Sequence, residues 1–364
     1  MENFRTAVIG CGGIANGKHL PSLKAISGVE LIAFCDLIPE RAEKAAKEYG
    51  VEGARVYTDY RELLEKEKPD VVHVCTPNRA HCEISCAAME AGCHVLCEKP
   101  MAICAADARK MLETSRRTGK TLSIGYQSRY RADSQYLKAE CEKGALGEIY
   151  YAKAHAVRRR AVPTWGVFLN EYEQGGGPLI DIGTHALDLT LWMMDNYRPK
   201  YCVGTKYRKL AEQNGNTGNI WGDWDPEKYT VEDSCFGFIV MENGATISLE
   251  SSWALNTLDV IEASTSLSGT KAGADMRDGL RINGVENGRQ YVLKPSFEAG
   301  GVAFVEGNGN ARPEVIEAWQ FYNAIRTGTK PCVLPEQAYI VSLILEGIYK
   351  SAESGKPYYF ELED

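Results

Sequence analysis

The sequence predicts an α/β protein with an N-terminal doubly wound parallel sheet (a Rossmann fold) and a C-terminal α+β domain containing a large, mainly antiparallel open sheet. Three observations lead there. The chain has 364 residues, more than one hydrophobic core usually holds. Its first third alternates short apolar runs with helical segments. Its second half contains strand-like segments with the Asn-Gly turn signals MENGAT and INGVENGRQ. We expect the domains to span residues 1–125 and 126–364.

The first domain is expected to contain repeated strand and helix units. Its strands are continuous apolar runs, as in a parallel sheet covered by helices on both faces. Pro39 and Gly50 mark the start and end of one helix. The expected strands are residues 5–10, 29–36, 70–77, 94–100 and 121–126, and the expected helices are 14–26, 39–50, 59–67, 80–92 and 105–119.

The second domain is expected to carry helices on one face of its sheet. A helix ends near Gly144 and a strand follows, while Gly175–Gly177 form a loop that leads into another helix. An open sheet face favours a homo-oligomer, either a dimer or a tetramer. Residues 211–230 form a long polar loop with Trp221 and Trp224. Further strands are expected in 200–210, 234–253 and 280–294, and the last helices at 313–328 and 335–355.

Composition limits the class of partner. The net charge of −8 argues against nucleic acid or an anionic membrane as the main partner. The N-terminus MENFRT lacks the apolar region of a signal peptide, so we expect a cytoplasmic protein. The 12 cysteines contain no C-x-x-C pair, and we interpret them as small buried side chains without a metal or disulfides.

The glycines after the first strand predict a dinucleotide site. Gly10, Gly12 and Gly13 leave a strand and enter a helix, where backbone N–H groups and the helix dipole can face a pyrophosphate. Asp36 ends the second strand, 26 residues after Gly10. A carboxylate there can bind both ribose hydroxyls of NAD and repels the 2′-phosphate of NADP. The alternative, a plain tight turn, does not account for Asp36.

Two further motifs carry groups able to move a proton. Lys99 of CEKP follows a parallel strand, at the sheet edge where ligands collect. Asp181 and His185 of DIGTH are spaced to share one face of a helix, and a histidine beside a carboxylate can serve as a general base. From position alone, a solvated lysine, a capping aspartate and a core histidine are equally good interpretations.

These motifs together resemble the Gfo/Idh/MocA oxidoreductases, the glucose–fructose oxidoreductase and inositol dehydrogenase group. The resemblance covers essentially the whole chain, through GCGGIA, CTPNRAH, CEKP, GYQSRY and GGGPLIDIGTHALDLTLW in family order. It implies a catalytic site of Lys99, Asp181 and His185. It also implies cofactor contacts from Gly10, Gly12, Gly13, Ile14, Asp36, Thr76, Asn78, His81, Glu98, Lys99 and Gln127.

The resemblance implies hydride transfer from a sugar or polyol to NAD. The segment AVRRRAVPTWGVF resembles a subgroup that oxidises pyranosides at C3, such as glycoside 3-dehydrogenases and levoglucosan dehydrogenase. In this reading His185 is the base, Lys99 stabilises the alkoxide, and Trp165, Arg129 and Arg158 contact the sugar; packing and surface charge are the plainer roles for these last three. Three alternatives stay open. These are an NAD-retaining glycosidase or lyase, an inositol or other polyol dehydrogenase, and a non-catalytic NAD-binding regulator.

Overall fold

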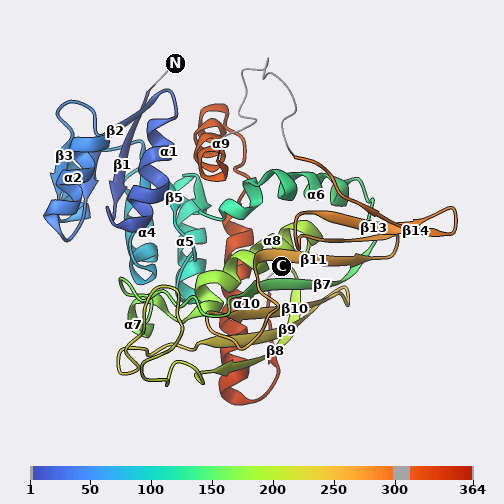
Figure 1. The fold of residues 1–364 in the computed structure, drawn as a ribbon. Helices are drawn as coiled ribbons and strands as arrows, with labels where there is room; N and C mark the ends of the chain where they lie inside the picture. Colours follow the sequence, from blue (N-terminus) through green and yellow to red (C-terminus); the bar gives the residue numbers. More distant parts are fainter. Residues whose placement is uncertain (1–2, 298–311, 363–364) are drawn as a thin grey trace. The chain divides into compact units, whose positions relative to one another are not determined.

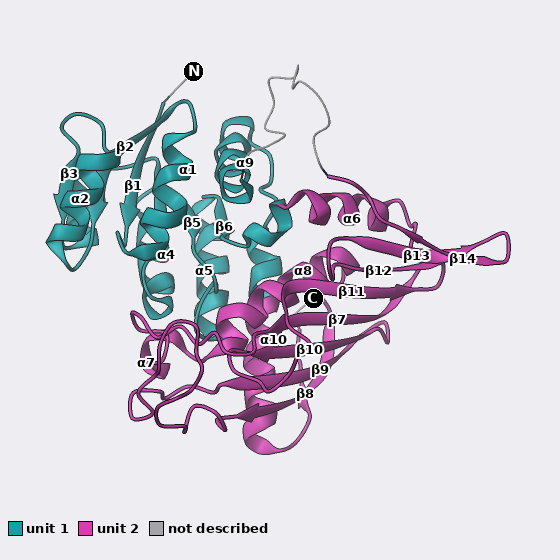
Figure 2. Ribbon diagram, viewed as in Figure 1, with its two compact units in different colours: residues 1–130, 303–339 teal, residues 131–302, 340–364 magenta. Residues whose placement is uncertain are grey.

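The chain divides into two compact units (Figure 1 and Figure 2). The computed structural model describes residues 3–297 and 312–362. Unit 1 comprises residues 1–130 and 303–339, and unit 2 comprises 131–302 and 340–364. The expected division into 1–125 and 126–364 differs from this one, because helix α9 (Pro313–Thr327) returns to unit 1. There its Phe321 and Tyr322 are part of the hydrophobic core.

The described part of unit 1 is built on six parallel strands in the order β3-β2-β1-β4-β5-β6. The order reverses between β1 and β4, the switch point of a doubly wound sheet. The short strand β3 was not predicted, because its three residues are too few to form an apolar run. The strands are β1 (Phe4–Ile9), β2 (Val29–Cys35), β3 (Arg55–Tyr57), β4 (Val71–Val74), β5 (His94–Cys97) and β6 (Leu122–Ile124).

The helices of unit 1 form two groups. Helix α1 contacts α2 and α9, as Figure 1 shows for α9, whereas α3 and α5 each contact α4. Two groups are expected for helices on the two faces of a sheet. The expected helix 14–26 is π-helical over Ala15–His19 before α1 begins. The helices are α1 (Leu20–Lys24), α2 (Pro39–Tyr49), α3 (Tyr60–Glu67), α4 (His81–Glu90) and α5 (Ala105–Thr118), with 3-10 turns at Asn78–Ala80 and Gln127–Tyr130.

Unit 2 is built, within its described residues, on a nine-stranded sheet in the order β14-β13-β12-β11-β7-β10-β9-β8-β15. Only β7 and β10 pair in parallel, so the predicted mixed and mainly antiparallel sheet is confirmed. The β13–β14 turn carries positive φ at Asn287 and Gly288, as the Asn-Gly signal predicts. The strands are β7 (Ile149–Val157), β8 (Pro199–Tyr207), β9 (Ser234–Met241), β10 (Thr246–Ser252), β11 (Ile261–Gly269), β12 (Ala272–Asp275), β13 (Arg281–Glu286), β14 (Arg289–Leu293) and β15 (Tyr358–Tyr359).

One face of this sheet is covered by helices. Helix α8 (Thr184–Met194) packs on β7 and β11, and Ile348 of α10 (Pro335–Ser354) fits against the paired glycines Gly204 and Gly237. Side chains of the alternate residues point to the other face, where Val203 is 41% and Phe238 is 47% exposed. The remaining helical segments are α6 (Ala132–Glu142), α7 (Glu171–Gln174) and a π-helical turn at Leu179–Gly183.

No helix in the described ranges is long and apolar enough to cross a membrane.

Candidate cofactor and substrate site

The three glycines after β1 have different roles. Gly10 has a φ of +88°, and a Cβ atom there would lie 2.6 Å from the carbonyl carbon and oxygen of Cys75. A side chain is therefore excluded at Gly10 by both backbone strain and the end of β4. At Gly12 and Gly13 a Cβ atom would meet no described atom within 4 Å. These two glycines leave open space beside the start of a helix, where a pyrophosphate fits.

Asp36 ties the glycine loop to the end of β2. Its carboxylate accepts hydrogen bonds from the backbone N–H of Cys11 at 2.8 Å and of Ile38 at 2.9 Å. Each carboxylate oxygen has a second lone pair, so the partly exposed Asp36 can still accept a ribose hydroxyl. Ile14 is 43% exposed just beyond the glycines. The loop thus has both polar and apolar groups available to a dinucleotide.

Thr76 and His81 follow β4 and differ in what they offer a ligand. The Thr76 hydroxyl is buried and has no hydrogen-bond partner among the described groups, as expected of a site that a ligand completes. His81 is fully buried, with its ring nitrogens 2.8 Å from the carbonyl oxygen of Pro100 and 2.9 Å from that of Thr76. His81 joins the loop after β4 to the loop after β5, which favours a positioning role over the predicted cofactor contact. Asn78 begins the 3-10 turn between them.

Glu98, the residue before Lys99, is buried in a network of charged groups. One of its oxygens accepts from Lys18 Nζ at 2.7 Å and from His19 Nε2 at 2.8 Å, and the other from the Lys99 backbone N–H at 3.2 Å. Burial alone would raise the pKa of Glu98, but the charge of Lys18 and the two side-chain hydrogen bonds hold it well below its usual range. These contacts favour Glu98 as an anchor of the Lys99 segment over the predicted cofactor contact. Gln127 also accepts from Lys18, at 3.2 Å.

Lys18 faces a second buried carboxylate, Glu317 of α9. Its Nζ lies 2.9 Å from Glu317 Oε2. Burial would lower the pKa of Lys18, but the two carboxylates raise it. Burial, with the added negative charge of Glu98, raises the pKa of Glu317 from 4.5 to about 7 despite Lys18. The single positive charge of Lys18 thus balances the carboxylate of Glu98, and Glu317 stays protonated up to near neutral pH.

Two histidines extend this network into the core. His19 Nδ1 lies 2.9 Å from His73 Nδ1, His73 Nε2 lies 3.1 Å from the Tyr322 hydroxyl, and that hydroxyl lies 2.9 Å from Thr6 Oγ1. Burial lowers the pKa of both histidines, so both are neutral. Because ionised Glu98 can only accept, His19 donates through Nε2 and accepts at Nδ1. His73 must then donate from Nδ1 and accept a hydrogen bond from the Tyr322 hydroxyl at Nε2. The ionised Glu98 therefore determines which group donates in each of these hydrogen bonds.

Asp181 and His185 lie in unit 2. The expected regular helix around them is π-helical over Leu179–Gly183, which includes Asp181, and α-helical from Thr184, which includes His185. Insertions of this kind recur at functional sites. Asp181 Oδ2 accepts a 3.0 Å hydrogen bond from the indole N–H of Trp253. Trp253 is fully buried and so fixes the carboxylate without contacting a ligand.

A buried glutamate holds the start of this helical segment. Glu232 accepts from the backbone N–H groups of Gly177 at 2.9 Å and Leu179 at 3.3 Å, and from the Tyr349 hydroxyl at 2.7 Å. Burial raises the pKa of Glu232 in spite of these bonds. A Cβ atom at Gly177 would lie 2.3 Å from the Glu232 carbonyl oxygen, so the glycines allow this close approach.

Two arginines predicted to bind sugar hydroxyls have protein partners. Arg129 is fully buried in unit 1, and its Nη1 donates to the Cys332 carbonyl at 3.0 Å and to Gln337 Oε1 at 2.6 Å. These contacts favour a structural role for Arg129. Arg158 of unit 2 donates to both carboxylate oxygens of Glu262 and to the Ala161 carbonyl, which uses three of its five N–H groups. Trp165 is 52% exposed and remains available to a ligand.

The sequence interpretation missed the buried partners of the predicted residues, four of which show why. Lys18, Glu232, Trp253 and Glu317 lie in no motif, and each partner is far away in the chain. A charged residue in an apolar helical segment, such as Glu317 in PEVIEAWQFYNAI, was the one available signal.

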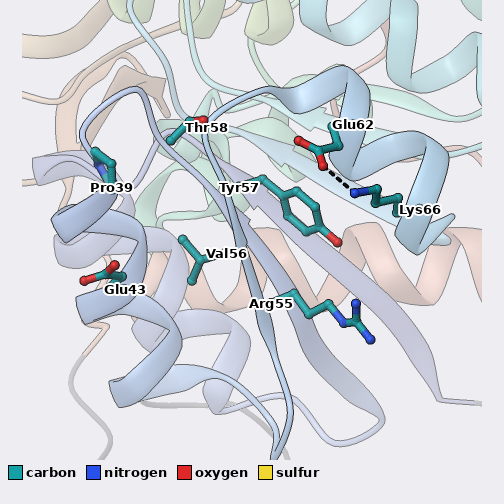
Figure 3. A pocket seen from close by; sticks show the side chains of 8 residues that line it. All are labelled: Pro39, Glu43, Arg55, Val56, Tyr57, Thr58, Glu62 and Lys66. Carbon is teal, nitrogen blue, oxygen red and sulfur yellow. Dashed lines mark hydrogen bonds and ion pairs between the residues drawn. The ribbon is translucent and has the colours of Figure 1, made fainter.

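A polar cavity of about 620 Å³ lies at the β3 edge of unit 1 (Figure 3). Glu62 and Lys66 on its wall form an ion pair. None of the predicted site residues lines it, and we assign it no role in the reaction. Its lining is Pro39, Glu43, Arg55, Val56, Tyr57, Thr58, Glu62 and Lys66.

Comparison with known proteins agrees with these features. The model of the oxidoreductase family with an NAD-binding Rossmann fold matches residues 4–126, and the Gfo/Idh/MocA C-terminal domain model matches residues 134–275. The chain is 39% identical over 354 residues to the D-glucoside 3-dehydrogenase of Escherichia coli K12, covering 97% of this chain and 96% of the relative. It is 31% identical to the inositol 2-dehydrogenase of Salmonella typhimurium, but over only 53% of this chain and 55% of the relative.

The fold also matches solved structures. Levoglucosan dehydrogenase in complex with NADH and L-sorbose superposes with a TM-score of 0.82 at 22% identity, covering 100% of both chains. The predicted fold class, the enzyme class and the NAD cofactor are confirmed. The open glycine loop, Asp36 and the Thr76 hydroxyl, which has no partner among the described residues, fit that cofactor. The chain therefore belongs to the Gfo/Idh/MocA family of NAD-binding oxidoreductases.

Proposed function

We propose that this enzyme oxidises a secondary hydroxyl group, the one at C3, of a pyranose sugar or glycoside with NAD. The observation that carries the proposal is the 39% identity to a D-glucoside 3-dehydrogenase across nearly the whole of both chains. The presence of Lys99, Asp181 and His185 in their motifs supports it and disfavours a non-catalytic regulator.

Unit 1 supplies the groups that would hold the cofactor. Gly12 and Gly13 offer open backbone to the pyrophosphate, Asp36 offers its carboxylate to the adenosine ribose, and Thr76 offers its hydroxyl. Bound NAD would supply a hydride acceptor at its nicotinamide.

The proton and the developing charge are assigned to the three motif residues. His185 takes the proton of the C3 hydroxyl, since loss of hydride from carbon requires loss of that proton. Lys99 donates a hydrogen bond to the same oxygen and stabilises its negative charge. Asp181, held by Trp253, orients the imidazole or binds a neighbouring hydroxyl.

The test is a panel of sugars supplied with NAD, followed by NADH absorbance. Methyl glucoside, free glucose, levoglucosan and myo-inositol cover the alternatives. We expect the glucosides to give NADH and a 3-keto product. NADH from myo-inositol alone would contradict the proposal and favour a polyol dehydrogenase. Glycoside cleavage without added NAD would favour an enzyme that retains NAD.

The proposal includes a homo-oligomer formed through the open face of the unit 2 sheet, in the cytoplasm. Val203 and Phe238 occupy paired positions on that face, and in the single chain they are 41% and 47% exposed. Phe238→Lys should reduce the molar mass measured by light scattering. A wild-type monomer at micromolar concentration would contradict this part of the proposal.

A further inference from the structure

Trp165 and Trp221 form an exposed aromatic pair in unit 2. The side chains are 52% and 41% exposed, and their ring centroids lie 4.8 Å apart at an interplanar angle of 82°. The Arg158 guanidinium lies 5.4 Å from the Trp221 ring centroid, while Glu262 holds its Nε and Nη2. Large rings gathered in contact with water commonly mark a binding surface.

Hydrogen bonds join the two segments that carry the pair. The Asn219 side chain bonds both the N–H and the carbonyl of Val162, at 2.8 and 3.0 Å. The Thr164 hydroxyl donates to the Trp221 carbonyl at 2.8 Å. These bonds join the segments that carry the two tryptophans, so a ligand would lose little affinity in ordering them.

The two tryptophans of the 211–230 loop have opposite roles. Trp224 is 4% exposed, its indole N–H donates to the Ala211 carbonyl at 3.1 Å, and its ring packs 5.9 Å from Tyr229. Trp224 thus anchors the loop in the core. Trp221, three residues earlier, faces water.

Ring contacts connect the pair to Asp181. Phe168 lies 5.9 Å from the Trp165 centroid and 6.5 Å from the Trp253 centroid, and Trp253 holds the Asp181 carboxylate. Burial would lower the pKa of Arg158, but its bonds to Glu262 and the charges of Glu262 and Asp181 raise it. A series of ring contacts therefore connects the exposed pair to Asp181, the residue assigned to the proposed sugar site.

We propose that Trp165 and Trp221 form a subsite for the aglycone of a glycoside whose glucosyl unit is oxidised beside Asp181. The aglycone is a ring with an apolar face, either an aryl group or a second pyranose, because both pack on indole rings. This inference rests on the proposed function and assigns Trp165 to the group attached to the oxidised sugar rather than to that sugar.

The test compares methyl and phenyl β-D-glucosides, with cellobiose as the second-sugar arm. We expect wild type to use phenyl glucoside or cellobiose with a kcat/KM roughly 2- to 10-fold above methyl glucoside, the range for one aromatic contact. Trp165→Ala and Trp221→Ala should each remove the difference, and Trp221→Ala should leave methyl glucoside turnover unchanged. Trp221→Phe, which keeps a ring, should retain most of it.

Trp319→Ala is the matched control, because Trp319 is also 41% exposed but lies on α9. The control should keep the preference. A wild type without preference, or a preference that survives both unit 2 substitutions, would overturn the subsite. If no glucoside reduces NAD, the proposed function fails. Calorimetry of phenyl against methyl glucoside on NAD-loaded protein then decides the subsite by the same pattern of variants.

Discussion

Replacing Glu317 with glutamine removes the second carboxylate that faces Lys18 in the core of unit 1. Glutamine keeps an oxygen that can accept from Lys18 Nζ, which lies 2.9 Å from Glu317 Oε2. The pair of Lys18 and Glu98 stays balanced at 2.7 Å. We predict that Glu317→Gln stabilises the enzyme relative to wild type as the pH rises.

The magnitude follows from the raised pKa. In the fold the pKa of Glu317 is about 7 against an ordinary 4.5, because of burial and the nearby charge of Glu98. The folded state holds this proton more tightly than the unfolded chain. The stabilisation that this proton gives the folded state is therefore complete below pH 4.5 and is lost as the pH rises through 7. The total loss is about 3 kcal/mol, of which about 2.5 kcal/mol falls between about pH 5 and about pH 8.

The assay is urea unfolding of both proteins at several pH values in that interval. The free energy of unfolding of the variant minus that of wild type should increase by roughly 2–3 kcal/mol from about pH 5 to about pH 8. Glu336→Gln is the control, because Glu336 forms a surface ion pair with Arg116 that is worth at most about 1 kcal/mol. A difference that stays constant with pH would refute the reasoning that one lysine leaves the second carboxylate protonated.

Further substitutions test the cofactor and reaction sites separately. Gly12→Ala should leave the midpoint of thermal unfolding unchanged, since a Cβ atom there meets no described atom within 4 Å. The same variant should bind NAD roughly tenfold or more weakly in a fluorescence titration. Unchanged affinity would show that the pyrophosphate does not bind at this loop. Asp36→Ser should reduce the ratio of kcat/KM with NAD to kcat/KM with NADP. Equal kcat/KM with both cofactors in wild type would contradict the assignment of Asp36 as the residue that selects NAD. Lys99→Ala and His185→Asn should each lower kcat by roughly two orders of magnitude or more while NAD still binds; near-full turnover would reduce the residue concerned to a structural role.

The local parts of the fold could be predicted from the sequence. Gly10, Gly12 and Asp36 act through neighbouring backbone, and the order of apolar runs is enough to define the parallel sheet. The weak elements could not be predicted. Strand β11, IEASTSLSG, has small and polar residues in place of an alternating apolar pattern, and its place is decided by pairing with β7.

The roles of the buried polar groups could not be predicted from the sequence for a different reason. Arg129 lies in the GYQSRY motif and was assigned to the sugar, but its partners are Cys332 and Gln337, far along the chain. Glu98 likewise takes its role from Lys18 and His19. The sequence does not distinguish a charged residue that binds a ligand from one that pairs with a buried group. Only the tertiary contacts show which role the residue has.

Oxidation at C3 is tested by the transfer of deuterium from a glucoside labelled at that carbon. Methyl glucoside carrying deuterium on C3 would be incubated with the enzyme and NAD, and the reduced cofactor analysed by mass spectrometry. We expect one deuterium in the NADH and a slower turnover than with the unlabelled sugar. NADH formed without deuterium would show that another carbon is oxidised and would contradict the assignment of C3.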